Sequence, residues 1–104
     1  MRVFNTMGSM GVTTLLTSTD TAQSLPSTLL TCPTSARPLA AATLVFETNN
    51  IRIAIGATPT QAGLGPLMYA GDSMRIVGRE NLNDFRYISA ANGVHGKIQV
   101  IPEY

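Results

Sequence analysis

Short alternating or continuous apolar runs, each ended by a turn signal, fill residues 44–104. Runs of this length, bounded by Gly, Pro and Asn, are typical of strands in a small antiparallel β-domain. In the run Ile51-Arg-Ile-Ala-Ile, alternation places Ile51, Ile53 and Ile55 on one face of a strand. The pattern predicts strands at 42–48, 51–55, 73–77, 85–90 and 97–101.

Turn signals between these strands predict how they connect. Thr48-Asn-Asn predicts a hairpin, because Asn tolerates left-handed backbone angles. Asn92-Gly93 is the strongest hairpin signal in the chain. The segment 78–85 predicts a loop with one helical turn that brings Leu82 and Phe85 into the core.

Residues 1–43 have a different character, with three charged residues and many threonines. Thr and Val favour a pleated, half-buried surface, so we expect short strands at 12–17 and 2–5. The segment 22–31 admits one helical turn, with Ser24 as its cap and Pro26 near its first position.

Two prolines flank small polar residues in the segment 33–38, which predicts a turn or linker. We therefore interpret residues 1–43 as a low-charge, Thr-rich extended arm with strands that contribute to assembly. Residues 44–104 form the antiparallel β-domain. The strands recur about every 8–12 residues, which is the spacing of a β-sandwich or barrel. The predicted fold is all-β, a small antiparallel sandwich or barrel.

Composition adds an expectation of self-association. Of 104 residues, 44% are hydrophobic and 12% are charged, with a net charge of +1. Soluble domains usually carry about 25% charged residues, so part of this surface is expected to be covered by copies of the chain or by a partner. The basic residues are scattered, so we expect no nucleic-acid partner. The sequence shows no signal peptide and no membrane span, which predicts no membrane partner.

Few residues suggest chemistry. Cys32 has no Cys or His at metal-ligand spacing, and we interpret it as a small buried hydrophobe. His95 follows Asn92-Gly93 without an evident orienting partner, although Asp84 or Glu103 would be candidates, and is interpreted as an exposed turn residue. Asp72 lies in Ala-Gly-Asp-Ser, where an Asp side chain bonds nearby backbone N–H groups. We expect no enzyme, and no catalytic, cofactor-binding or metal-binding residue.

A set of short elements in residues 44–104 resembles a group of small structural proteins of tailed bacteriophages. The Thr58-Pro-Thr and Ala70-Gly-Asp elements, at their separation, are the most distinctive part. The chain departs from the pattern at Ala57 and in its tail, Pro102-Glu-Tyr. The elements that carry the resemblance are Phe46-Glu-Thr, Ile51-Arg, Gly56-Ala-Thr-Pro-Thr, Gly63, Leu67, Ala70-Gly-Asp, Leu82, Phe85-Arg-Tyr-Ile and Lys97-Ile-Gln-Val.

The resemblance implies a virion component with a β-sandwich or barrel core, assembled in the host cytoplasm. The first hypothesis is a capsid decoration or cement protein that self-associates, with a trimer as one such homo-oligomer, and stabilises the head by bridging subunits of the major capsid protein. The alternatives are a tail, collar or fibre-base protein that contacts other virion proteins, and a small carbohydrate-binding β-module. The particle position, oligomer symmetry, strand topology, partner surface and host stay open at this point, and so do the roles of Cys32 and His95.

Overall fold

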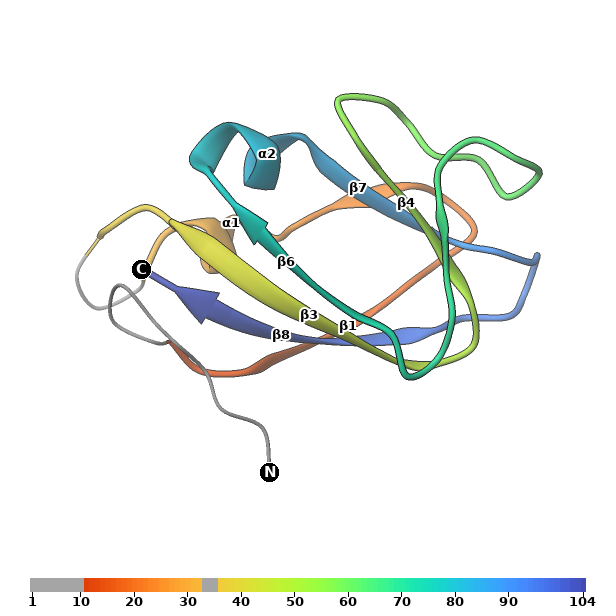
Figure 1. Cartoon of the computed structure of the whole chain (residues 1–104), viewed down its shortest axis with the longest axis horizontal. Helices are drawn as coiled ribbons and strands as arrows, with labels where there is room; N and C mark the ends of the chain where they lie inside the picture. The colour runs from red at the N-terminus through yellow and green to blue at the C-terminus, as the bar shows by residue number, and fades with distance from the viewer. Residues whose placement is uncertain (1–10, 33–35) are drawn as a thin grey trace.

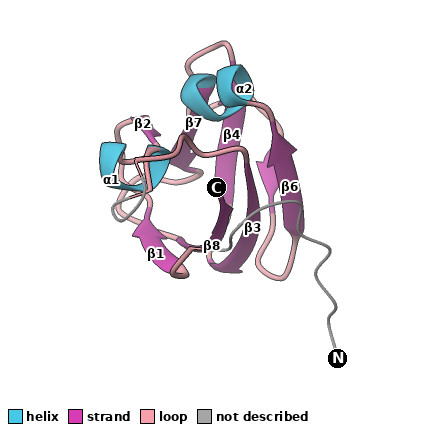
Figure 2. Cartoon of the chain, turned by 90° about the vertical axis from the view of Figure 1, so that its left-hand side faces the viewer, coloured by secondary structure: helices cyan, strands magenta, loops and turns pink. Residues whose placement is uncertain are grey.

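The computed structural model describes residues 11–32 and 36–104, and these form two four-stranded antiparallel sheets packed face to face (Figures 1 and 2). This confirms the predicted all-β sandwich. Sheet A contains, in spatial order, β1 (Thr14–Thr17), β8 (Lys97–Glu103), β3 (Ala41–Thr48) and β6 (Ser73–Val77). Sheet B contains β2 (Gln23–Ser24), β7 (Phe85–Ser89), β4 (Ile51–Ile55) and β5 (Leu67–Met68).

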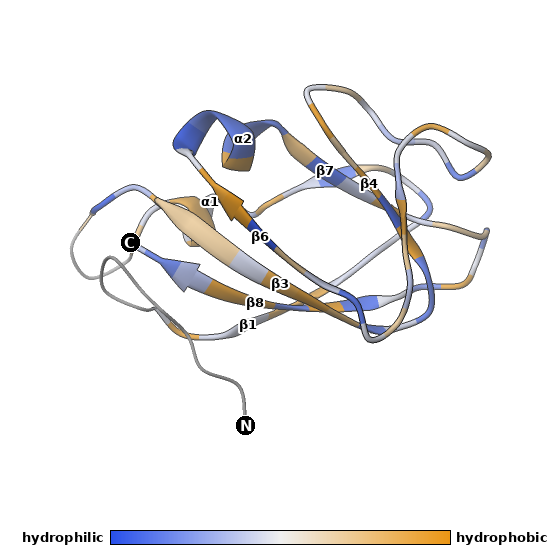
Figure 3. Ribbon diagram, viewed as in Figure 1, coloured by the Kyte–Doolittle hydropathy of each residue, from blue (hydrophilic) through white to orange (hydrophobic). Residues whose placement is uncertain are grey.

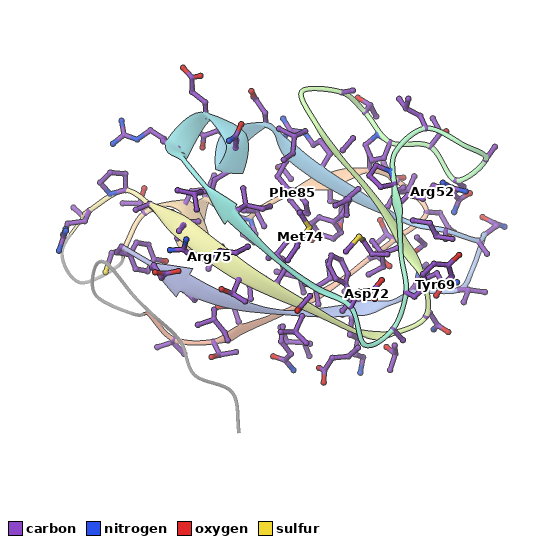
Figure 4. The ribbon with its side chains drawn as sticks, in the orientation of Figure 1. Arg52, Tyr69, Asp72, Met74, Arg75 and Phe85 are labelled. Atoms are coloured by element: carbon purple, nitrogen blue, oxygen red, sulfur yellow. The ribbon has the colours of Figure 1, made fainter. Side chains whose placement is uncertain are left out.

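The core lies between the sheets and is built from the inward half of each alternating strand. On β8, Ile98, Val100 and Pro102 point inward, as their spacing predicts. Phe46 on β3 and Phe85 at the start of β7 are fully buried. Met74, labelled with Phe85 in Figure 4, is partly buried and packs against the core. The buried core consists of Leu16, Leu25, Leu29, Leu39, Ala42, Leu44, Phe46, Ile51, Ile53, Ile76, Leu82, Phe85, Tyr87, Ile98, Val100 and Tyr104.

Most connections carry the chain from one sheet to the other, so the hairpin predicted at Thr48-Asn-Asn is wrong. The turn predicted at Asn92-Gly93 is present and is closed by a bridge between Ala91 and Val94, but the strands on either side of it, β7 and β8, do not pair. The link at Asn49 joins β3 of sheet A to β4 of sheet B, with Asn49 at φ 55° and a register shift between Phe46 and Thr48. A bulge increases local twist, which lets a strand turn into the other layer. The tight turn at Asn92-Gly93 likewise links β7 to β8 across the sheets, with Gly93 at φ 74°.

The segment that we expected to form an arm is part of the sandwich wherever the structure describes it. β1 pairs with β8 along its length, and β2 pairs with β7. The expected boundary at residue 43 falls inside β3, a central strand of sheet A. The physical reason is that β1 supplies Leu16 and the following segment supplies Leu25 and Leu29 to the common core. The expected strand at 2–5 lies outside the described residues.

Two short helices close one end of the sandwich. α1 (Ser27–Leu30) begins after Pro26, with no side-chain cap, so the Ser24 cap predicted from sequence is wrong. α2 (Arg79–Asp84) confirms the predicted helical turn, and Leu82 is its buried residue. The rest of α2 is largely hydrophilic (Figure 3).

Candidate interaction surface

The outward side chains of sheet A form a surface with little charge, here called the open face. Cross-strand register places Leu15, Gln99, Val45 and Ser73 in one row across all four strands. None of these four residues is fully buried. The open face consists of Leu15, Thr17, Thr43, Val45, Ser73, Arg75, Val77, Lys97, Gln99 and Ile101.

An ion pair neutralises much of the charge at one end of this sheet. Arg75 Nε donates to Glu103 Oε2 at 3.0 Å, and its Nη2 donates to Oε1 at 3.1 Å. This two-point contact fixes both side chains. The Glu103 carboxylate raises the pKa of Arg75 above its ordinary value through this hydrogen bond. Glu103 itself is buried, so Arg75 presents the exposed part of the pair.

The outer face of sheet B is different because one of its own loops folds back onto it. Arg52 alternates with buried Ile51 and Ile53, so its side chain points outward. Its Nη1 donates to the Gly65 carbonyl at 2.9 Å, and its Nε donates to the Gln61 carbonyl at 3.3 Å. Arg52 therefore holds the 56–66 loop beside this face (Figure 4).

The margins of the two sheets also differ. Both margin strands of sheet B, β2 and β5, are two residues long. In sheet A the margins are β1, with four residues, and β6, with five. Very short edge strands offer few unpaired main-chain groups to another chain, whereas longer ones offer a row. Within the described residues, sheet A thus has the longer margin strands and the longer rows of unpaired main-chain groups.

A polar relay that includes two buried serines lies where two connections between the sheets meet. Gly96 N–H donates to Ser18 Oγ at 2.8 Å, Ser18 and Ser89 hydroxyls are 2.7 Å apart, and Ser89 Oγ lies 3.1 Å from His95 Nδ1. If each hydroxyl donates to the next group along, His95 Nδ1 is the acceptor and every hydroxyl proton has a partner. The relay links the ends of β1 and β7 to the turn before β8.

The structure places His95 on the surface, as predicted, and gives it Ser89 as a partner, which the sequence did not indicate. It brings neither Asp84 nor Glu103 to His95 through a hydrogen bond among the described residues. Ser18 and Ser89 are both fully buried. A hydroxyl without solvent access cannot meet a substrate, so the geometry assigns this relay to the joining of connections.

Asp72 adopts the turn role that the sequence predicts. Its Oδ2 accepts the Tyr69 N–H at 2.8 Å, and its own N–H donates to the Tyr69 carbonyl at 3.0 Å. Figure 4 shows the two residues side by side. Cys32 packs against the core, as expected of a small hydrophobic residue, but it is partly rather than fully buried.

A hollow of about 380 Å³ lies next to the ion pair. Its lining includes Arg37, Pro38, Arg75, Val77 and Tyr104. The Tyr104 hydroxyl donates to the Leu29 carbonyl at 2.6 Å, and burial raises the pKa of this phenol. Tyr104 therefore serves to tie β8 to α1, and the hollow has one ion-paired and one exposed arginine at its rim.

Within residues 11–32 and 36–104, no three His, Cys, Asp or Glu side chains come together as a group that could hold a metal ion. Neither helix of this part of the chain is long and apolar enough to cross a membrane. Comparison with protein-family models, with curated proteins and with solved structures finds no match to this chain.

Proposed function

We propose that this chain is a structural subunit of a larger protein assembly, which it joins through sheet A. The observation that carries the proposal is the contrast between the open face and the loop-covered face of sheet B. On the open face, Leu15 and Val77 expose 49% and 54% of their surface. A wide, weakly charged β-surface of this kind is what a protein partner covers.

The assembly that we propose is the virion of a tailed phage, with this chain as a decoration or cement protein that bridges capsid subunits. The sequence resemblance of residues 44–104 supports this setting. The mechanism is mechanical, because each copy adds a modest contact area and many copies act together. A position in the tail, collar or fibre base is the alternative within the same setting.

Quantitative mass spectrometry of purified particles tests this proposal. A decoration protein should be present in copy numbers on the order of hundreds per particle. A ring or spike in a tail has only a few copies, because its closed symmetry fixes their number. Absence of the chain from particles would refute the virion role.

Val45 and Gln99 lie at the centre of the open face, so Val45→Glu should reduce binding to particles stripped of this protein. Ala54→Glu, on the outward side of sheet B, serves as the matched control.

A further inference from the structure

The two margins of sheet A differ in how well they are protected against pairing. On β6, the side chain of Asn81 donates to the Val77 carbonyl at 3.0 Å, which occupies an edge acceptor. Arg75 stands in the middle of the same strand with its charge exposed. Charged residues and covering segments are the usual protections of an edge strand. β6 is therefore protected by α2 and by a charge.

Among the described residues, β1 has neither protection. Residues 12–19, Val-Thr-Thr-Leu-Leu-Thr-Ser-Thr, contain no charged residue and no proline. Ser18 N–H donates to the Gly96 carbonyl across the β1–β8 pair. Since donors alternate along an antiparallel strand, the main-chain groups of Thr13, Leu15 and Thr17 point away from β8, toward the open margin. β1 and β6 lie at opposite margins of the sheet (Figure 2).

We propose that the β1 margin binds a second copy of this chain, with Leu15 of each copy on a two-fold axis. The inference rests on the proposed structural role and names the partner and the contact. In this antiparallel register Leu15 faces Leu15, and Thr13 faces Thr17. Outward side chains meet outward side chains, as a continuous eight-stranded sheet requires. Thr–Thr and apolar pairs directly opposite each other stabilise such pairing.

The register also satisfies the main chain. Leu15 with Leu15, and each Thr13 with the opposing Thr17, are positions whose N–H and C=O groups point to the margin. Paired residues of this type exchange both hydrogen bonds, so three pairs give about six. A shift by one residue would place buried Leu16 on the outward side. The alternation thus excludes a one-residue shift, and of the registers that keep outward side chains together the proposed one places Leu15 opposite Leu15.

The test is the mass of the protein in solution, measured by light scattering after gel filtration. The chain should have twice the mass of one copy. Leu15→Lys should produce a monomer, because two like charges would lie opposite each other about 5.5 Å apart between Cα atoms. Val77→Lys is the matched control, with similar exposure on the other margin, and should stay dimeric. Circular dichroism checks that both variants remain folded.

Charge complementation makes the register itself testable. Leu15→Lys and Leu15→Glu should each be monomeric alone and should form a dimer when mixed. In a Cys32→Ala background, Leu15→Cys should form a disulfide between copies under mild oxidation, since paired Cα atoms lie within disulfide range. A monomeric parent chain, a dimer that Leu15→Lys leaves intact, or a trimer that both lysine variants break would overturn the two-fold pairing.

These outcomes separate the pairing from the proposed function. A Leu15-dependent dimer that is absent from particles would keep the pairing and remove the virion role. If the chain is abundant in particles but its mass in solution does not change in Leu15→Lys, the virion role is supported and the pairing through β1 is refuted.

Discussion

Sheets A and B share one core but differ in how far their outer faces and margins are covered. Sheet B has two-residue margin strands, and Arg52 holds its own loop against the outward side. Sheet A has longer margins, and in the part of the chain that the structure describes its outward side chains stay partly or fully exposed. One chain therefore has an outer face on sheet B that its own loop contacts and an outer face on sheet A whose side chains stay exposed or half-buried. This difference is the reason why we place the proposed assembly contacts on sheet A.

Within sheet A the contrast is repeated on a smaller scale. β6 carries Arg75 and is bonded by Asn81, whereas β1 carries neither a charge nor a bond of this kind among the described residues. An assembly that used both margins in sheet pairing would grow without limit, as open-ended contacts do. In the proposed pairing, protection of the β6 margin would limit the assembly to a closed pair.

Removal of the charge from β6 should have the largest effect. The double variant Arg75→Thr/Glu103→Gln replaces both partners, so no buried carboxylate is left alone. We expect it to convert the dimer into larger, polydisperse assemblies, because both margins would then accept a neighbour. Light scattering as a function of protein concentration measures the change.

Arg75→Lys retains the charge and should remain dimeric, which makes it the control for that experiment. If the double variant keeps the parent mass at every concentration, Arg75 does not protect the margin.

A smaller effect is expected when the covered side of sheet B is disturbed. Gly65 has φ 100°, and a Cβ atom there would overlap the Ile53 carbonyl oxygen. Gly65→Ala should therefore reduce the free energy of unfolding by roughly 1–3 kcal/mol, measured by urea denaturation. Gly63 has open space around it, so Gly63→Ala should leave stability within about 0.5 kcal/mol. Equal effects of the two substitutions would show that Gly65 is not the point at which the loop is fixed.

The smallest effect concerns the tie between β8 and α1. Tyr104→Phe removes the hydrogen bond to the Leu29 carbonyl and should reduce the free energy of unfolding by about 1 kcal/mol.

Burial raises the pKa of Tyr104, with a further contribution from Cys32, and it raises the pKa of Tyr87. The folded chain thus holds these protons more tightly than the unfolded chain does.

The raised pKa values of Tyr104 and Tyr87 make the folded chain less stable at strongly alkaline pH. The stabilisation is fully present below about pH 10, the ordinary pKa of tyrosine, and is lost as the pH rises through the raised values. Thermal melting followed from neutral to strongly alkaline pH should show a falling Tm in the parent. The Tm of Tyr104→Phe should fall less steeply, because Tyr87 is then the only one of these two tyrosines that contributes. An identical alkaline slope in both proteins would contradict the role of Tyr104.

The alternating pattern predicts the individual strands well. The segment 51–55 is β4, and 73–77 is β6, at the residues that the pattern indicates. What it cannot predict is which strands pair, because a tight turn reverses the chain without fixing the layer that it enters. Asn49 and Gly93 have the left-handed backbone expected of turns. Nonetheless both lie at connections between sheets, where the bulge after Phe46 and the common core decide the path.

The candidate surface could be predicted only in part. The absence of charge in residues 12–19 is visible in the sequence, but that β1 is a margin strand depends on its pairing with β8, far away in the chain. The Ser18–Ser89 contact joins residues separated by 71 positions, and no local pattern indicates it. The closing of sheet B by Arg52 likewise depends on the path of the 56–66 loop.

Amide hydrogen exchange at the two margins of sheet A shows whether a second copy pairs with β1 and leaves β6 free. By the alternation of the ladders, the N–H groups of Leu15 and Val77 both point away from their neighbouring strands. Pairing through β1 predicts slow, concentration-dependent exchange at Leu15 and fast exchange at Val77, and the protection at Leu15 should disappear in Leu15→Lys. Fast exchange at Leu15 at every concentration, or equal protection at both margins, would contradict the account.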